Sequence, residues 1–476
     1  MKNPVVIPTY PPNYEYPPSD YRNIHGRPSV TVSPRGLTLG TSEYFNDGAD
    51  FGPDTPGTST CGIQEAVTHA QKTGAAVSLM AGTYIISETI TISSGSGAVA
   101  IYGVPVSLFF TSQTSATQVR GTRIFPAASF AGSVLFNLEN SEDAVSVSGL
   151  GLFGLPASSC QALGSSGTAP TGMLDGLYVR SGTGCVSNML FWNCDNAYKF
   201  TGGVNYGTTD HHGFQIVNCN VGISNAGTGN AFQAIVTFNN YTNGVSINDL
   251  SVDEAIYDDL YLYDGYVGIS VQTPSGSVSK IYVTNCHYEG NGLRFLSMDQ
   301  AGQAEVFVSG VTTYAQMLAY LNGSGVSKIF ISQGYALDGG YGGSAIVRMA
   351  SGATNSGYLR LRDFDLGAAS NLSPGTVPSG FSVFMLDCPG YNPQGFSATT
   401  PSIPSSGTAQ ENTNPYSVRV YILTGGTATG YTITDPSGTT QAISVTLAAG
   451  MEITLDPGAS ITLTYTVAPT WKWYGV

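Results

Sequence analysis

The chain has 476 residues, of which 17 are Lys or Arg and 31 are Asp or Glu, so its formal net charge is −14. This balance argues against a nucleic-acid partner, because such a surface needs clustered basic side chains and none cluster here. Hydrophobic residues make up 42% of the chain and charged residues 10%, with 60 Gly and 28 Tyr. The composition excludes disorder and predicts an all-β protein with many tight turns and a polar, uncharged surface.

Further classes are disfavoured by the sequence. No run of about 18 apolar residues occurs, so we expect no membrane span. The residues after Met1 lack the apolar core of a secretory signal peptide, although the composition is that of an extracellular surface. Seven cysteines are spread along the chain without a CxxC pair, so no metal site is supported at them and we expect no cofactor.

Residues 1–40 are expected to form an extended arm rather than a packed domain, because proline is dense there. Tyrosines between the prolines bury area while keeping a polar tip, which favours docking on a partner or a neighbouring subunit over a free tail. The residues concerned are Pro4, Pro8, Pro11, Pro12, Pro17, Pro18, Pro28, Tyr10, Tyr14, Tyr16 and Tyr21.

A short helix is predicted after the arm. Apolar residues recur there at helical spacing, namely Ile63, Ala66, Val67 and Ala70. The helix follows an acidic turn at 46–50 and precedes a Gly-Thr-Tyr turn at 82–84. This arrangement resembles the opening of the pectate-lyase-like right-handed parallel β-helix superfamily. The resemblance implies that the helix caps the open end of a solenoid, whose unpaired edge must be covered.

Residues 41–395 are predicted to form the coils of that parallel β-helix. Short strand-like units repeat, and the dipeptide Asn-Cys recurs at 193, 218 and 285. The first gap is 25 residues and the second is 67, close to three turns of about 22, which is typical of a solenoid. Asn tolerates the left-handed backbone conformation that a corner needs.

The last part of the chain is expected to be separate from the coils. Residues 396–415 are predicted to be a Pro- and Ser-rich linker, and residues 416–476 a small antiparallel β-sandwich. The strand at 418–422 and the terminal segment 471–475 resemble small C-terminal β domains in structural proteins of viruses from hot environments. That resemblance implies a virus of a thermophilic archaeon as the source. The scarcity of charged residues limits self-repulsion over a wide pH range and suggests that the habitat is acidic.

The family resemblance also implies candidate catalytic residues. Asp210 and His211, in Asp-His-His-Gly, resemble the Gly-His-Gly element of polygalacturonases, and the pair Asp258 and Asp259 resembles their Asp-Asp pair. The order of the two motifs is reversed relative to that family. Hydrolysis of a glycosidic bond needs paired carboxylates, but an Asp pair before a strand is more often a turn or a coil cap.

Acidic and aromatic residues are dense in the same region. Asp249, Asp253 and Glu254 begin an acidic stretch that continues to Asp264. Its alternatives are a Ca²⁺ site and a solvated acidic loop. Sugar rings stack on aromatic faces, so Tyr257, Tyr261, Tyr263, Trp471 and Trp473 are the candidate glycan-binding residues. Strict alternation along a strand would place the three tyrosines on one face.

Two functions follow from these features. The preferred hypothesis is a virion spike similar to a phage tailspike, a homotrimeric β-helix stalk at the virion surface. Its arm would bind capsid or tail proteins, and the spike would attach to a host-surface glycan or glycoprotein. The alternative is a secreted or virion-borne enzyme, a polysaccharide lyase or glycoside hydrolase on the same fold.

Overall fold

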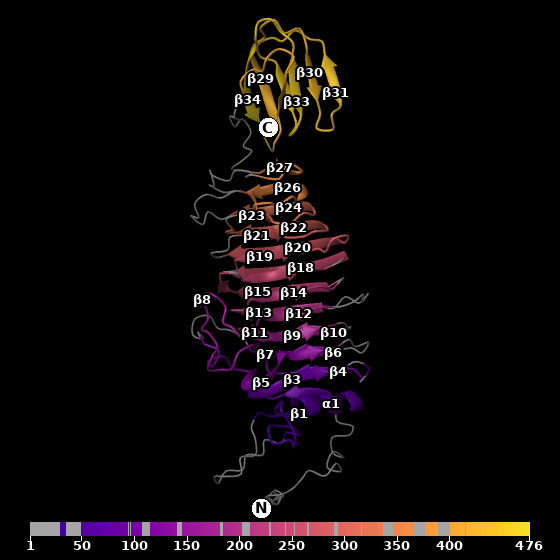
Figure 1. The fold of residues 1–476 in the computed structure, drawn as a ribbon, viewed down its shortest axis with the longest axis vertical. Coiled ribbons are helices and arrows are strands. Elements are labelled where there is room, and N and C mark those ends of the chain that lie inside the picture. The colour runs from indigo at the N-terminus through magenta and orange to yellow at the C-terminus, as the bar shows by residue number, and fades with distance from the viewer. Residues whose placement is uncertain are drawn as a thin grey trace, which may run out of the picture. The chain divides into compact units, whose positions relative to one another are not determined.

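A computed structural model gives the structure of the chain, which divides into two compact units, residues 1–270 and 271–476. In the first unit and in the N-terminal part of the second, the strands stack in successive coils (Figure 1). The described residues are 29–34, 49–93, 95, 97–106, 115–139, 145–180, 184–201, 210–227, 230–242, 244–251, 253–263, 266–289, 294–315, 317–336, 346–365, 377–388, 400–414 and 416–476. Most of the expected arm, residues 46–48 of the acidic turn, and Asp264 therefore lie outside them.

The first unit is a parallel β-helix with three strand faces, here called A, B and C. Face A is built from β1 (Ser29–Val32), β2 (Ala76–Leu79), β4 (Val99–Tyr102), β6 (Val145–Ser148) and β10 (Gly184–Ser187). Three longer strands run from face A into face B, namely β13 (Asp210–Val217), β15 (Asn230–Phe238) and β18 (Asp253–Tyr263). All these pairings are parallel, which confirms the predicted fold class.

Faces B and C complete each coil. Face B also contains β7 (Leu150–Phe153) and β11 (Leu190–Trp192), while β3 (Gly82–Ile92) and β5 (Thr122–Leu138) continue from B into C. Face C continues through β9 (Asp175–Val179), β12 (Asn196–Phe200), β14 (Val221–Asn225) and β17 (Val245–Asp249). Strand β19 (Val267–Val271) contains the boundary between the units, and a two-residue pair links β8 (Ser166–Gly167) to β16 (Asn240–Tyr241).

One residue in a left-handed conformation marks the corner between faces A and B in successive coils. In the first unit these residues are Gly149, Asn188, Gly213, Ala234 and Asp259, with φ between 51° and 72°. In the second unit they are Asn285, Gly310, Gln333, Asp363 and Asp387, with φ between 49° and 70°. The corner interrupts strand alternation. If odd-numbered residues point inward before the corner, even-numbered residues point inward after it, or the reverse.

The Asn-Cys repeat is therefore only partly a structural repeat. Asn193 and Asn218 occupy equivalent positions at the end of face B, directly after the paired residues Trp192 and Val217. Asn285 instead lies at the corner between faces A and B of its own coil. The gap of 25 residues is one coil. The gap of 67 residues is close to three coils, as predicted, but it joins two different corners.

The capping helix is confirmed as α1 (Ile63–Thr73), and its four buried apolar residues are those predicted. Gly62 precedes the helix with φ 78°, and a Cβ there would lie 2.5 Å from the backbone nitrogen of Gly52, so only glycine fits. The helix packs on β1 to β4 and covers the start of the coils (Figure 1). No described helix has the length and apolar character needed to cross a membrane.

Strand β1 lies inside the range expected for the arm. It pairs in parallel with β2, and the Tyr84 hydroxyl donates to the carbonyl of Val32 at 2.7 Å. The structure thus places residues 29–32 in the first coil.

The coils of the second unit follow the same plan. Faces A and B are formed by β20 (Val278–Glu289), β22 (Gln303–Thr313), β24 (Val326–Ala336), β26 (Ser356–Asp365) and β27 (Phe381–Leu386). Face C contains β21 (Arg294–Met298), β23 (Met317–Leu321) and β25 (Val347–Met349). Their core is a column of fully buried aliphatic side chains, of which Ile281, Val306 and Ile329 are register partners.

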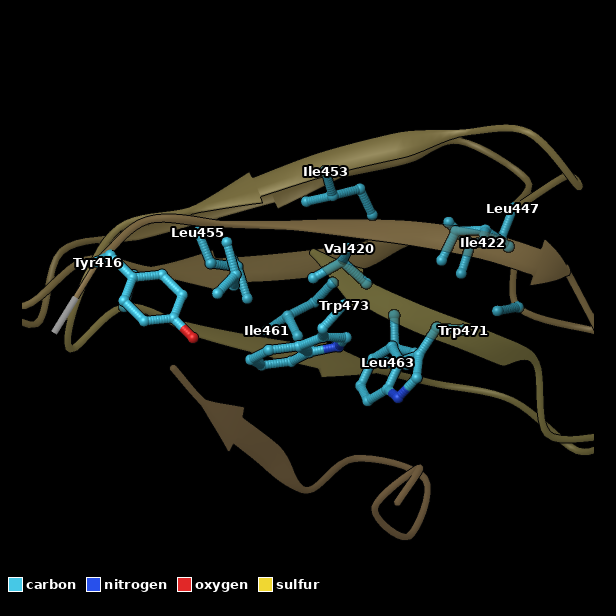
Figure 2. Close-up of a cluster of buried hydrophobic side chains, with 13 residues drawn as sticks. Tyr416, Val420, Ile422, Leu447, Ile453, Leu455, Ile461, Leu463, Trp471 and Trp473 are labelled. Carbon is cyan, nitrogen blue, oxygen red and sulfur yellow. The ribbon is translucent and has the colours of Figure 1, made fainter. Parts of the chain in front are cut away.

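The C-terminal segment forms two small antiparallel sheets around one apolar core (Figure 2). One sheet contains β28 (Ala409–Glu411), β33 (Ser460–Leu463), β30 (Tyr431–Thr434) and β31 (Thr440–Ile443). The other contains β32 (Glu452–Leu455), β29 (Val418–Thr424) and β34 (Thr470–Gly475). Strand β28 belongs to the range expected as a linker, and Thr400 accepts a hydrogen bond from the Trp473 backbone at 3.0 Å. The described part of that range is therefore built into the sandwich.

Candidate functional site

His211, a predicted catalytic residue, lies in the core of the β-helix. Its side chain is 1% exposed, and its ring lies 5.1 Å from Tyr198 and 5.0 Å from Phe232. Its Nε2 atom is 3.2 Å from the Tyr198 hydroxyl. Burial, with a smaller contribution from His212, lowers the pKa of His211 to about 3. A neutral, enclosed imidazole does not reach a substrate, so His211 is corrected to a core residue.

Of the neighbouring candidates, Asp258 lies on the outside of face A. Ser187, His212, Gln233 and Asp258 are successive register partners, so the half-exposed His212 and Asp258 belong to one outward column. Asp210 pairs one position earlier, with Ala231. Asp259 is exposed and is the corner residue of its coil, with φ 53°. The structure thus brings Asp258 into line with His212 rather than with His211.

Tyr257 is also corrected to a core residue. It is fully buried, and its hydroxyl donates to Oδ2 of Asp249 at 2.6 Å and accepts from Nδ2 of Asn225 at 3.2 Å. The backbone nitrogen of Ser251 donates to Asp249 at 2.9 Å. Desolvation raises the pKa of Asp249, although these donors oppose the rise. This first acidic residue of the predicted cluster is thus part of a buried hydrogen-bond network.

Tyr261 and Tyr263 lie on the outer side of face B, as candidate glycan-binding residues should. Tyr261 is 37% exposed, and the two ring centroids are 6.4 Å apart with planes within 11°. Phe238, one coil earlier and in register with Tyr263, lies 5.7 Å from Tyr263 and 6.5 Å from Tyr261. These three residues form the aromatic platform. Phe238 was not predicted, although its distance of 25 residues from Tyr263 equals the spacing of Asn193 and Asn218.

The loop between β7 and β9, residues 154–174, covers the part of face B that precedes the platform. The outward residues Phe125, Phe153 and Trp192 pack beneath it in one buried cluster, against which Phe238 also packs. Gln161 anchors the loop: its carbonyl accepts from Trp192 Nε1 at 2.8 Å, and its side chain accepts from the Tyr241 hydroxyl at 2.7 Å. The platform is thus where outward aromatic rings emerge from under this loop.

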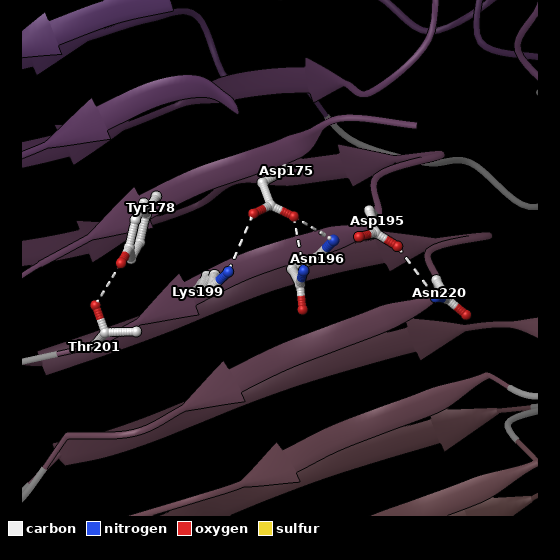
Figure 3. Close-up of polar contacts among 7 residues, drawn as sticks. All are labelled: Asp175, Tyr178, Asp195, Asn196, Lys199, Thr201 and Asn220. Carbon is white, nitrogen blue, oxygen red and sulfur yellow. Dashed lines mark hydrogen bonds and ion pairs between the residues drawn. The ribbon is translucent and has the colours of Figure 1, made fainter. Parts of the chain in front are cut away.

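A third cluster of polar residues lies on face C (Figure 3). Oδ1 of Asp175 accepts from the backbone and side-chain nitrogens of Asn196 at 3.0 and 2.7 Å, and Oδ2 is 3.6 Å from Nζ of Lys199. Asp195 accepts from Asn220 at 3.1 Å. Donors on the following coil thus engage each carboxylate, so we interpret the cluster as a clamp between coils. No motif or spacing in the sequence marks these two acids.

The two C-terminal tryptophans are buried rather than presented to a partner. Trp471 is 6% exposed and Trp473 1%, and both point into the core between the sheets (Figure 2). Nε1 of Trp471 donates to the Pro401 carbonyl at 2.9 Å. Both are corrected from glycan-binding candidates to core residues.

The described residues contain no group of three or more His, Cys, Asp or Glu side chains arranged to hold a metal ion. The acidic stretch that suggested calcium is dispersed instead. Asp249 is buried, Asp253 and Glu254 are exposed at the start of β18, and Asp258 lies on the outward column of face A. Calcium binding therefore has no assembled site in that part of the stretch.

Comparisons with known proteins concern the fold. No family model and no curated protein matches the chain. Among solved structures, it is similar to the DFA-IIIase of Arthrobacter chlorophenolicus A6 in complex with GF2, with TM-score 0.49, 13% identity, and coverage of 75% of this chain and 94% of that one. The enzymatically active domain of tailspike protein 4 of bacteriophage CBA120 gives TM-score 0.37 and 10% identity, over 89% and 67% of the chains. Endo-xylogalacturonan hydrolase of Aspergillus tubingensis gives 0.36 and 15%, over 78% and 97%.

Proposed function

We propose that this β-helix protein binds a glycan on the aromatic platform of face B. The observation that carries the proposal is the pair of near-parallel rings of Tyr261 and Tyr263 on the outer surface, flanked by Phe238. Tyrosine presents a rigid apolar ring with a polar tip, which suits the apolar face and hydroxyl rim of a sugar. The covering loop pairs through residues 166–167 with residues 240–241, which follow Phe238 closely in the chain.

Removing both platform tyrosines should abolish most of this binding. Each ring contributes on the order of 1 kcal/mol to a stacking contact, so the variant Tyr261→Ala/Tyr263→Ala should bind at least about tenfold more weakly. A glycan array with the wild-type chain identifies a ligand, and titration calorimetry then measures both affinities. Tyr102→Ala is the matched control, since Tyr102 is a strand residue that is 47% exposed on face A of the same unit. Equal affinity of wild type and double variant would contradict the proposal.

We further propose that the protein acts as a homotrimeric virion spike that attaches to a host-surface glycan or glycoprotein. The Pro- and Tyr-rich arm supports this role, because its composition suits docking on capsid or tail proteins. Light scattering at neutral and acid pH should give three times the mass of one chain, and a monomer under both conditions would contradict the spike.

A glycan-cleaving enzyme is the second candidate, and one observation favours it. Asp258 and Tyr261 lie on either side of the corner residue Asp259, so a carboxylate is near the aromatic platform along the chain. A hydrolase needs a second carboxyl group to complete the pair. The glycan that binds should therefore also be assayed for release of new reducing ends, and release that Asp258→Asn abolishes would favour the enzyme.

A further inference from the structure

A column of aromatic and basic side chains lines the outer side of face A in the second unit. Tyr282, Phe307 and Phe330 are register partners on β20, β22 and β24, whose order along the stack is visible in Figure 1. Their ring centroids are 5.2 and 4.9 Å apart, with planes within 13° and 3°. All three side chains are half-buried, so their faces cover one another and their edges point outward. The next position in this register is Arg360 on β26.

Three rings surround the guanidinium group of Arg360. Its Cζ atom lies 4.9 Å from the centroid of Tyr358, on the same strand, and 5.9 Å from those of Phe330 and Phe384 on the neighbouring strands. Cation–π contact with several rings fixes a guanidinium group without covering its N–H edge. Arg360 remains exposed and has no ion pair among the described residues, whereas Arg362 lies 3.4 Å from Asp363.

The charge around Arg360 is locally positive in an acidic chain. Lys280, Glu305 and Lys328 are outward register partners on the adjoining column, and Lys328 pairs with Glu305 at 2.9 Å. Lys280 and Arg360 therefore leave this face positively charged, although the whole chain has net charge −14. A ligand of opposite charge gains from this excess, most strongly at the oriented Arg360.

We propose that Arg360, held by Tyr358, Phe330 and Phe384, binds a carboxylate group of an anionic glycan. The proposal rests on the proposed glycan-binding function and assigns a second, charge-selective contact to it. A guanidinium group offers two parallel N–H donors that match a carboxylate, and its orientation by the rings lowers the entropy lost on binding. The ring edges beside it provide apolar contact for the sugar that carries the carboxylate.

Nucleic acid is less well matched to this face. A base inserted between two rings needs a gap of about 6.8 Å, twice the ~3.4 Å step of a strand, whereas the parallel rings are 5.2 and 4.9 Å apart. Nucleic acid also requires many phosphate contacts, and the described residues of this face offer two cations without an ion pair, Lys280 and Arg360.

The test compares hyaluronan, which carries a carboxylate on every second sugar, with neutral dextran of similar length. The full chain should bind hyaluronan more tightly, and Arg360→Gln should lower that affinity about tenfold while leaving dextran unchanged. Arg360→Lys keeps the charge without the paired donors and should give an intermediate affinity. Arg180→Gln is the matched control, since Arg180 is also exposed and lies 5.0 Å from a single ring, Tyr178. Thermal unfolding checks that each variant is folded.

The outcomes separate this proposal from the platform proposal. If glycans bind and Tyr261→Ala/Tyr263→Ala weakens them, but Arg360→Gln leaves the preference for hyaluronan unchanged, the anion site is wrong and the platform stands. An equal loss in Arg180→Gln also overturns the site, because the effect is then general charge. Competition by an oligothymidine, or a loss of hyaluronan binding explained by a change in native mass, overturns it in favour of nucleic acid or self-association. If neither hyaluronan nor dextran binds but the array yields another glycan, the anion site is wrong and the platform stands. If the array yields no glycan, both proposals fail.

Discussion

Acidification from pH 6.5 to pH 3 should cost the first unit about 4 kcal/mol of unfolding free energy through His211 alone. The folded protein holds this imidazole neutral, because burial lowers its pKa to about 3 from an ordinary value of 6.5. Below pH 6.5 the unfolded chain takes up a proton at this position and the folded chain does not. The contribution of the neutral His211 to the unfolding free energy is therefore fully present above pH 6.5. It falls as the pH decreases, by about 1.4 kcal/mol for each pH unit.

The buried Asp249 acts with the opposite sign. Its pKa is raised in the folded state, so the folded chain binds the proton more tightly than the unfolded chain. Its contribution is fully present below the ordinary pKa of an Asp, about 3.9, and is lost as the pH rises through the raised value. The pH dependence of the unfolding free energy should contain both slopes. A variant that removes only the His211 slope is therefore needed.

The variant His211→Phe/Tyr198→Phe separates them. The structure gives the Tyr198 hydroxyl a hydrogen bond to His211, so replacing both partners by apolar rings leaves no unpaired polar group from this contact. We expect the double variant to match the wild type near pH 7, to within about 1 kcal/mol, and to lose the acid slope. Tyr198→Phe alone is the control that keeps the slope. Urea unfolding at several pH values, monitored by hydrogen exchange of β13, measures the difference, and an unchanged slope in the double variant would contradict the account.

The sequence predicted those parts of the fold that depend on local patterns. The apolar spacing of Ile63, Ala66, Val67 and Ala70 identified the buried face of the capping helix, because helical periodicity alone decides that face. Alternating runs identified the parallel strands, since one side of each faces the core. The boundaries were harder to predict. Residues 29–32 pair with β2 and residues 409–411 with β33, and long-range pairing of this kind leaves no local signal in Pro- and Ser-rich sequence.

The candidate site was predicted in part, for a reason visible at one residue. Strict alternation places Tyr257, Tyr261 and Tyr263 on the same side of a strand, but Asp259 adopts φ 53° between them. The corner reverses the parity, so Tyr257 points into the core while Tyr261 and Tyr263 point out. His211 and His212 precede the corner of their own coil, so ordinary alternation turns His211 inward beside Phe232 and His212 outward beside Gln233. A single sequence gives the residue types at such corners, but not which Asp or Asn adopts the left-handed conformation.

Replacing Trp473 by alanine should unfold the C-terminal sandwich rather than weaken glycan binding. The ring is 1% exposed and lies among Val420, Ile461 and Leu463 in the core between the two sheets (Figure 2). Loss of a buried tryptophan costs about 3–5 kcal/mol, which is comparable to the whole stability of a domain the size of residues 416–476, about 3–9 kcal/mol at ~0.05–0.15 kcal/mol per residue. Hydrogen exchange of the β29 amides in the full chain should therefore accelerate strongly, while exchange in the coils stays unchanged.

The two tryptophans also provide an internal control for this argument. The indole nitrogen of Trp473 is buried with no hydrogen-bond partner among the described residues, whereas that of Trp471 donates to Pro401. Changing Trp471 to Phe removes the hydrogen bond to Pro401 and leaves that carbonyl without a donor. This costs about 1–3 kcal/mol in addition to the cost of the smaller side chain. Changing Trp473 to Phe removes an unpaired donor, so we expect Trp473→Phe to be the milder of the two. If Trp473→Ala instead leaves β29 exchange unchanged and reduces binding to the glycan found on the array, the tryptophan contacts a partner and its assignment to the core is wrong.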